Sequence, residues 1–225
     1  MGGVTPGREQ PGREEPAQQG PPGHLTAFPA HRLSPTSPLY RAHQRDRGPW
    51  WFASGGGRFD LVEPRGTCYL ATTASAALRE RLGPVLARRA TVPASTLDGV
   101  VVSTLRPGAA SSSELLRLAN LRSSRAAEFG VTRELESMTP YDVPRRWASA
   151  FDAAGWGGIR YGPRFSPGGA SAIALFGPAG EDANRPVDPE PVAADGLTRA
   201  PATVSLPQRA ELTVIAPPRR GGRTR

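Results

Sequence analysis

Short apolar runs alternate with helical patterns through the middle of this 225-residue chain. Four runs have the length and the apolar content of buried strands: CYLA (68–71), VVVS (100–103), GIRY (158–161) and AIALF (172–176). Three segments have the spacing or the end signals of helices: ASAALRERL (74–82), SELLRLANL (113–121) and 142–155. The pattern predicts an α+β fold, a compact mixed α/β single domain.

The segment from Asp142 to Gly155 carries the clearest helix signals. Asp142 can cap the N-terminus of a helix, and Pro144 suits its first turn. Trp147 and Phe151 are four residues apart and therefore share one helix face. Gly155 can adopt the left-handed conformation that ends many helices. We expect this aromatic pair to pack in the core.

The two ends of the chain lack these patterns. Residues 1–30 contain a tandem pentapeptide, PGREQ followed by PGREE, with almost no large apolar side chains, so we expect them to be unstructured. The predicted domain covers residues 31–180. Residues 181–216 are predicted to form an extended excursion that ends in a strand, ELTVIA at 211–216, and residues 217–225 form a basic tail.

The net charge of +8 would ordinarily favour a polyanionic partner. However, all 28 basic residues are Arg, they are scattered along the chain, and a coding bias towards GC-rich codons explains them as readily. The segment AAEFGVTRELES (126–137) resembles a helix-turn-helix, the DNA-binding alternative, but its second half carries Glu134 and Glu136, which phosphate would repel. Nucleic acid is therefore not the expected partner.

Several kinds of chemistry are excluded by what the sequence lacks. The single cysteine, Cys68, rules out an internal disulfide and a multi-cysteine metal site, and it favours a reducing compartment. There is no GxSxG elbow, Walker loop or HExxH motif. The first twenty residues hold no apolar run typical of a signal peptide, and no segment has the length of a membrane span. We expect a cytoplasmic protein with no metal and no membrane partner.

One stretch, residues 56–80, brings together a cation, an aromatic ring and a carboxylate. Arg58 follows three glycines, whose flexible backbone suits close approach to phosphate. Tyr69 lies in the CYLA run, on the strand face opposite Cys68. Glu80 lies on a predicted helix among small residues, with no Arg three or four positions away. Taken singly, each has an ordinary alternative: a loop Arg, a packing Tyr and a solvated Glu.

Taken together, these pieces resemble the RES domain family, which is named for Arg, Glu and Ser. The resemblance runs from about residue 38 to residue 176. Its elements are LYRAH (39–43), GGRFD (56–60), TCYLA (67–71), ALRE (77–80), RRWASAF (145–151), GWGGIRYGPRF (155–165) and AIALF (172–176). The resemblance implies a fold similar to ADP-ribosyltransferases and an enzyme that degrades NAD.

The resemblance also implies roles for individual residues. It assigns Arg41 and Arg58 to the pyrophosphate and ribose region of NAD, Tyr69 to the nicotinamide end and Glu80 to the nicotinamide ribose. NAD is then the substrate, with water or inorganic phosphate as the acceptor and no separate cofactor. Family toxins are commonly neutralised by an Xre-type antitoxin and some assemble as dimers, so the resemblance implies both kinds of partner.

The chain departs from the family at one position. Family members carry Ser shortly after the Tyr of the GIRY strand, in a Tyr-x-Ser-Arg pattern, whereas this chain has Pro163 at that place. Proline offers neither a hydroxyl nor a backbone N–H. Arg164 is retained, and it contacts either a substrate phosphate or a structural carboxylate. The departure keeps open a second reading, a catalytically impaired RES-like domain that binds a nucleotide or a partner.

Overall fold

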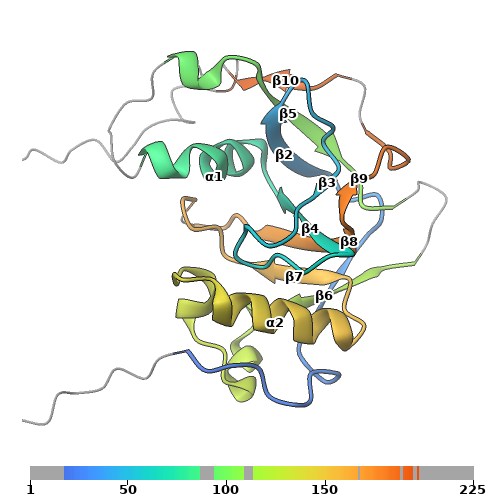
Figure 1. The fold of residues 1–225 in the computed structure, drawn as a ribbon, viewed down its shortest axis with the longest axis vertical. Coiled ribbons are helices and arrows are strands. Elements are labelled where there is room, and N and C mark those ends of the chain that lie inside the picture. Colours follow the sequence, from blue (N-terminus) through green and yellow to red (C-terminus); the bar gives the residue numbers. More distant parts are fainter. Residues whose placement is uncertain are drawn as a thin grey trace, which may run out of the picture.

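An eight-stranded mixed sheet forms the centre of the protein (Figure 1). The computed structural model describes residues 18–86, 94–108, 114–166, 168–187, 190–194 and 197. Along the sheet the strands are β1 (Ala30–Leu33), β6 (Leu116–Asn120), β7 (Gly158–Tyr161), β8 (Ala172–Pro178), β4 (Arg65–Ala71), β2 (Leu39–Gln44), β5 (Val100–Leu105) and β10 (Val192–Ala193). Neighbours are antiparallel except β6 and β7, which are parallel. A separate ribbon pairs β3 (Trp51–Phe52) with β9 (Gly180–Glu181).

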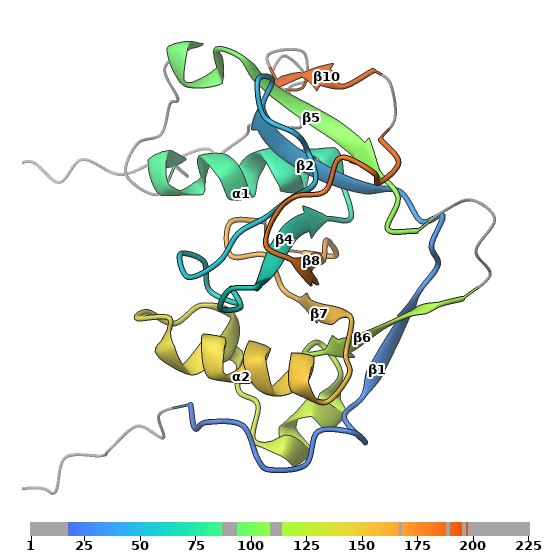
Figure 2. The same ribbon diagram turned by 45° about the vertical axis from the view of Figure 1, so that its right-hand side comes forward.

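Two α-helices, α1 (Ala74–Leu86) and α2 (Asp142–Ala153), cover one face of this sheet. Helix α1 lies beside β2, and α2 lies beside β7 (Figures 1 and 2). Ala71 of β4 packs under α1, whereas Tyr69 of the same strand packs against the core cluster that contains Trp147 and Phe151 of α2. Side chains two residues apart point to the same face of a strand. The two helices therefore cover different parts of one face, with the middle of β4 between them.

Strand β4 shows the predicted alternation. It pairs along its whole length with β8. Cys68 and Leu70 are buried in one core cluster, on the face away from the helices, while Tyr69 faces the other way. The four strands predicted from the runs 68–71, 100–103, 158–161 and 172–176 are confirmed as parts of β4, β5, β7 and β8. The predicted α+β single domain is thereby confirmed as well.

The predicted helix at 142–155 is confirmed as α2. Pro144 lies in its first turn, and Gly155, just past its end, has a φ of 78°. Trp147 and Phe151 are fully buried, as their spacing predicts. Their rings meet Phe28 with centroids 6.4 and 4.8 Å away, in edge-to-face arrangements. Each such aromatic pair contributes about 0.5–1.5 kcal/mol beyond the area that it buries.

The helix predicted at 113–121 is wrong, because residues 116–120 form strand β6. Leu116 and Leu118 pack on one face of the sheet, while Ala119 is buried on the other. In so short an apolar run, a helical spacing and a strand alternation both fit. Pairing with β1 on one side and β7 on the other decides in favour of the strand.

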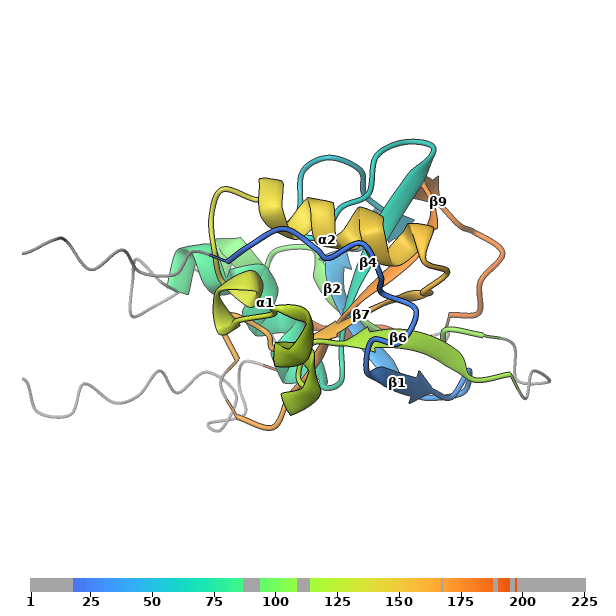
Figure 3. The ribbon, with the colours of Figure 1, turned by 90° about the horizontal axis from the view of Figure 1, so that it is seen from below.

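Residues 18–30 were expected to be unstructured, yet they pack against the domain. Leu25 and Phe28 are buried core residues. The indole N–H of Trp147 donates to the Gln19 carbonyl at 2.9 Å, and that of Trp156 donates to the Leu25 carbonyl at 3.1 Å. In Figure 3 this segment, in blue, runs along α2. The domain therefore includes residues before 31, because Leu25 and Phe28 cover its aromatic side chains.

The segment that resembled a helix-turn-helix forms two short 3₁₀ helices instead, η2 (Ser124–Phe129) and η3 (Arg133–Glu136). A third, η1 (Ala94–Leu97), precedes β5. Leu135 and Glu136 of η3 are buried, and the exposed residues include the carboxylate Glu134, so this segment does not form the two-helix unit that reads a DNA groove. The strand expected at 211–216 and the basic tail at 217–225 lie outside the described residues. No helix in the described parts of the chain is long and apolar enough to span a membrane.

Candidate active site

A cavity of about 420 Å³ lies between α1 and the middle of the sheet. This volume is within the range of about 300–1,000 Å³ that small-molecule sites occupy. Its walls come from β2, β4, α1 and the end of β7. The lining residues are Tyr40, Arg41, Ala42, Tyr69, Leu70, Ala71, Ala77, Glu80, Arg81 and Tyr161. Two residues of the predicted constellation, Tyr69 and Glu80, thus meet at one cavity.

Glu80 is the carboxylate of this cavity, and the chain holds it firmly. Its Oε2 accepts from the backbone N–H of Arg164 at 3.1 Å, and its Oε1 accepts from that of Phe165 at 2.7 Å. Burial raises the pKa of Glu80 above its ordinary value of 4.5, and these backbone donors oppose the rise. The Arg58 guanidinium also acts against the rise. Glu80 is therefore a fixed, partly desolvated carboxylate. It is not the solvated surface side chain that its sequence position alone would allow.

The small residues around Glu80 have two structural roles: one leaves space for the cavity, and the other leaves space for a packed ring. Ala77 borders the cavity and leaves it open. Gly83 instead receives the ring of Phe165, which a Cβ at that position would overlap. The loop 164–166 is therefore seated on α1, with its N–H groups on Glu80. Ser166 is buried there, and its hydroxyl lies near enough to Glu80 to lower the pKa of that carboxyl, although it has no hydrogen-bond partner of normal geometry among the described residues.

Tyr69 anchors the glycine-rich loop through its hydroxyl. The hydroxyl donates to Asp60 Oδ1 at 2.7 Å and accepts from the Phe59 N–H at 2.8 Å. The other Asp60 oxygen, Oδ2, accepts from the N–H groups of Gly56 and Gly57 at 2.8 and 2.5 Å. Burial, followed by the neighbouring Asp60 carboxylate, raises the pKa of Tyr69 well above 10.0. The hydroxyl is thus a neutral structural group, and the ring faces the cavity.

We expect Tyr69→Phe to lower the free energy of unfolding by about 1–3 kcal/mol, because it leaves a buried carboxylate oxygen and a backbone N–H without their partner. Urea unfolding followed by tryptophan fluorescence measures this loss. The matched control is Tyr40→Phe, which also removes a hydroxyl from the cavity wall. That hydroxyl makes no hydrogen bond within the described residues. Equal stability of the two variants would contradict an anchoring role for Tyr69.

Arg58 projects from the loop that Asp60 and Tyr69 hold. Its Nη1 donates to the Glu136 carbonyl, and its guanidinium lies over the Tyr141 ring, 5.2 Å from the centroid. Its Nε is buried without a hydrogen-bond partner among the described residues. Arg58 does not line the cavity itself, but its charge acts on both Glu80 and Tyr161. The structure therefore places Arg58 near enough to Glu80 for its charge to favour the ionised carboxylate, while its guanidinium contacts the Glu136 carbonyl and the Tyr141 ring.

Arg41 borders the cavity, but its guanidinium lies on the other face of the sheet. Because Tyr40 pairs with Ala71, Arg41 shares a face with Leu70, away from Tyr69. Its Nη1 donates to the carbonyls of Pro49 and Trp51, at 2.7 Å each, and lies 3.0 Å from Cys68 Sγ. The structure does not bring this cation to Glu80.

Two functional candidates escaped the sequence reasoning. Arg81 is an exposed residue that lines the cavity next to Glu80, and the amide oxygen of Gln44, in its favourable orientation, lies 3.3 Å from Arg81 Nη2. Its spacing of four residues from Ala77 could have placed it on the cavity face of α1. Asp60 stands within the GGRFD motif, but only the fold reveals that it is buried and accepts from three donors.

Arg164 gives its backbone N–H to Glu80, whereas its guanidinium lines a second, smaller hollow of the surface. It forms no ion pair with a carboxylate in the described part of the chain, so the structural carboxylate that the sequence left open is not found there. No group of three or more His, Cys, Asp or Glu residues suited to a metal occurs in the described ranges.

The fold and the cavity define a class of protein, a single α+β domain with a cavity of small-molecule size between a helix and the face of a mixed sheet. Within it the chain belongs to the RES domain family, whose profile matches residues 38–195. The suspected family is therefore confirmed. A similar solved structure is a chain of the M. tuberculosis MbcT–MbcA toxin–antitoxin complex, with a TM-score of 0.50 and 16% identity over 64% of this chain and 76% of that one. That likeness extends to the fold alone. No curated protein matches the sequence.

Proposed function

We propose that the protein cleaves the bond between nicotinamide and ribose in NAD and transfers the ADP-ribosyl group to water or to inorganic phosphate. One observation carries the proposal: Glu80 is a held, partly buried carboxylate beside two tyrosine rings in a cavity of small-molecule size. Membership of the RES domain family supports it. The proposal needs no cofactor and no metal.

The reaction develops charge on the sugar. As the C1–N bond breaks, its electron pair goes to the pyridinium nitrogen, which becomes neutral, and the ribose becomes an oxocarbenium-like cation. The Glu80 carboxylate stabilises that cation more than it stabilises the ground state, which is the condition for acceleration. Water or phosphate then forms the new C–O bond, and water releases a proton. A carboxylate also stabilises the sugar cation in glycoside hydrolysis. Here the leaving group is already cationic, so it needs little protonation by a general acid.

The neighbours of Glu80 have supporting roles in this proposal. The rings of Tyr69 and Tyr161 hold the flat nicotinamide. Arg58 balances the charge near Glu80 and reaches towards the ribose and pyrophosphate. Arg81 takes the phosphate contact that the family resemblance assigned to Arg41, since its guanidinium is on the cavity side of the sheet. Arg41 then serves to hold the chain before and at β3.

The alternative, a binding domain without activity, rests on Pro163. Ser166 weakens it, because this serine supplies a hydroxyl beside Glu80 from three residues further along the same loop. We propose that Ser166 takes the place of the family serine. Ser166→Ala should then lower nicotinamide release, whereas a protein that only binds NAD would release none in either form.

The direct test follows nicotinamide by liquid chromatography after incubation of the protein with NAD, with and without inorganic phosphate. Release in both conditions, with ADP-ribose as the other product in phosphate-free buffer, supports a glycohydrolase. Release that requires phosphate, with a phosphorylated ADP-ribose as the product, supports a phosphorylase. Absence of release in both conditions, from protein that is folded by circular dichroism, would reject the proposed activity.

The pH dependence provides a second prediction. Burial raises the pKa of Glu80 above 4.5, and only the ionised carboxylate stabilises a cationic sugar. Activity is therefore present above the raised pKa and is lost as the pH falls through it. We expect the acid limb of kcat/KM to have a midpoint above 4.5, measured as initial rates of nicotinamide release across a buffer series. A flat profile down to pH 4.5 would contradict the role of this carboxylate.

We further propose that the protein is the toxin of a toxin–antitoxin pair. The similar fold comes from a toxin–antitoxin complex, which favours this role. The proposed partner is an Xre-type antitoxin, and the proposed assembly contains a homodimer of this chain. Expression that arrests bacterial growth, together with a fall in cellular NAD, would support the role. Unimpaired growth at a level of expression that yields active enzyme would reject it.

A further inference from the structure

A second hollow, of about 240 Å³, lies next to the loop that holds Glu80. It shares no lining residue with the first cavity. We call it the arginine hollow and define it by its six polar and charged lining residues, which are Arg122, Arg133, Glu136, Ser137, Arg164 and Ser166. Three of these are cations and one is an anion, so the lining carries an excess of positive charge.

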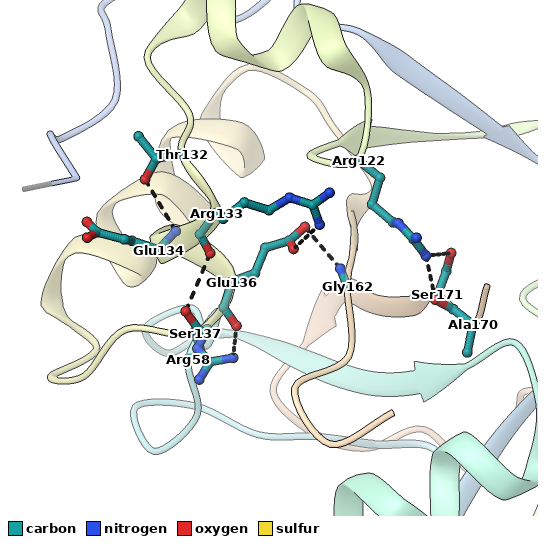
Figure 4. A network of polar contacts seen from close by, with 10 residues as sticks. All are labelled: Arg58, Arg122, Thr132, Arg133, Glu134, Glu136, Ser137, Gly162, Ala170 and Ser171. Carbon is teal, nitrogen blue, oxygen red and sulfur yellow. Dashed lines mark hydrogen bonds and ion pairs between the residues drawn. The ribbon is translucent and has the colours of Figure 1, made fainter. Parts of the chain in front are cut away.

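Among the described residues, the cations of the arginine hollow have no carboxylate at close ion-pair distance. Arg122 Nη1 donates to the Ala170 carbonyl and to Ser171 Oγ, which are neutral acceptors. Arg164 forms no ion pair within the described residues. Arg133 reaches Glu136 only at 3.9 Å, and its side chain is 91% exposed. Figure 4 shows Arg122 and Arg133 near Gly162, with the head of Arg122 turned towards Ser171 and Ala170.

The carboxylate of the arginine hollow is already engaged. Glu136 Oε1 accepts from the Gly162 N–H at 3.0 Å, and a Cβ at Gly162 would lie 2.8 Å from Oε2. Glu136 thus fastens the start of the 162–166 loop and does not neutralise all three guanidinium groups. Because the carboxylates of the described residues do not neutralise all of these cations, the arginine hollow attracts anions, and the attraction is strongest at low ionic strength.

A hydroxyl in the same wall has no hydrogen-bond partner of normal geometry among the described residues, although it lies near enough to Glu80 to lower the pKa of that carboxyl. This hydroxyl belongs to Ser166, which is 5% exposed. Buried side-chain polar atoms in native proteins nearly always have a partner, so an unsatisfied one needs an explanation. An oxygen-rich anion seated in the hollow would provide an acceptor for this hydroxyl.

We propose that the arginine hollow is a binding site for a phosphate group, either free phosphate or the phosphate of a nucleotide. Guanidinium groups bind phosphate oxygens as two-pronged donors, and the tetrahedral anion offers acceptors in the several directions from which these side chains approach. At about 240 Å³ the hollow suits an anion of this size better than a whole nucleotide. The binding stands by itself, whether or not the first cavity cleaves NAD.

The site would act on Glu80 through a short segment. Arg164 and Ser166 contribute side chains to the arginine hollow, while the backbone N–H groups of residues 164 and 165 bind the Glu80 carboxylate. A phosphate that contacts these two side chains restrains the segment whose N–H groups hold Glu80. We therefore expect phosphate bound in the arginine hollow to restrict the motion of the Glu80 carboxylate in the first cavity.

Isothermal titration of the full chain with inorganic phosphate at low ionic strength tests the site, because screening weakens such contacts as salt rises. We expect saturable binding that Arg133→Gln weakens by about tenfold, the loss of one charge-assisted contact. The matched control is Arg125→Gln, which removes the same charge from an exposed arginine paired with Glu128 outside the hollow. Its phosphate affinity should equal that of the wild type. Ser166→Ala should weaken binding without removing charge.

Absence of saturable binding up to about 10 mM phosphate, well beyond millimolar affinity, would overturn the proposal. So would equal phosphate affinities for wild type and Arg133→Gln, provided that both unfold at the same temperature. A repeat with ADP-ribose present distinguishes the two sources within the proposal. Displacement of phosphate assigns the hollow to nucleotide phosphate, and independent binding assigns it to free phosphate. Because no NAD is present, failure here leaves the proposed cleavage activity unaffected.

Discussion

Glu80→Gln is expected to lower kcat for nicotinamide release by about 100- to 1,000-fold, the loss typical for removal of one preorganised electrostatic group. Glutamine has the same shape, and its amide oxygen can still accept one of the two N–H groups of Arg164 and Phe165. The negative charge that the cationic sugar requires is absent. The substitution therefore tests charge with little change in geometry. Liquid chromatography of nicotinamide, combined with the thermal midpoint of each protein, provides the measurement.

The control for Glu80→Gln is Glu128→Gln, which neutralises an exposed carboxylate paired with Arg125 at 3.5 Å. Its kcat should remain within about twofold of the wild type, because surface substitutions of this kind have small effects. If Glu80→Gln retained most of the wild-type kcat while Glu128→Gln behaved as expected, the central role proposed for Glu80 would be lost. Loss of activity together with a large fall in the thermal midpoint would instead indicate that Glu80 acts mainly by anchoring the loop.

Asp60→Ala is expected to cost about 3–5 kcal/mol of unfolding free energy, because it leaves the N–H groups of Gly56 and Gly57 and the Tyr69 hydroxyl without their acceptor, at about 1–3 kcal/mol each. Asp60 is 1% exposed, so water cannot easily replace the carboxylate. Asp60→Asn should cost about 1–2 kcal/mol less, since the amide oxygen can still accept from the glycine N–H groups. Urea unfolding of the three proteins measures the series.

Both Asp60 variants should also lower nicotinamide release at temperatures where they remain folded, because the loop that carries Arg58 loses its anchor. The control is Asp98→Asn, which changes an exposed aspartate after η1 and should alter stability by less than about 0.5 kcal/mol. An order of stability in which Asn is as costly as Ala would show that charge, and not the number of acceptors, is what the loop requires. Wild-type stability of Asp60→Ala would contradict the anchoring role entirely.

Much of the fold could be predicted from local patterns, and the exceptions have a common cause. The strands at 68–71 and 158–161 and the helix from residue 142 carry signals within a few neighbouring residues. The segment 113–121 does not, because its leucines satisfy a helix and a strand equally well. Residues 18–30 follow a polar repeat and carry few large apolar side chains, yet Leu25 and Phe28 cover the rings of α2. A contact with residues more than a hundred positions away leaves no local signature.

The candidate site likewise combines features that the sequence shows with features that depend on which strands become neighbours. Tyr69 and Glu80 are close because a strand passes directly into a helix, which the sequence shows. Arg41 points away because Tyr40 pairs with Ala71, and such a register depends on which strands become neighbours. The four-residue spacing from Ala77 places Arg81 on the same side of its helix, but only the assembled sheet shows that a cavity lies there.

By itself, the sequence determined the strand alternation that turns Tyr69 away from Cys68. It also determined that the side chains next to Glu80 on its helix are small. It also determined the motifs by which the family is recognised. Only the tertiary structure decided that Asp60 binds the Tyr69 hydroxyl, that Gly83 receives Phe165, and that the loop after β7 donates two N–H groups to Glu80. Periodicity acts over a few residues along one strand or helix. The partners of Glu80, in contrast, are 84 and 85 residues away and meet it only when the sheet is assembled.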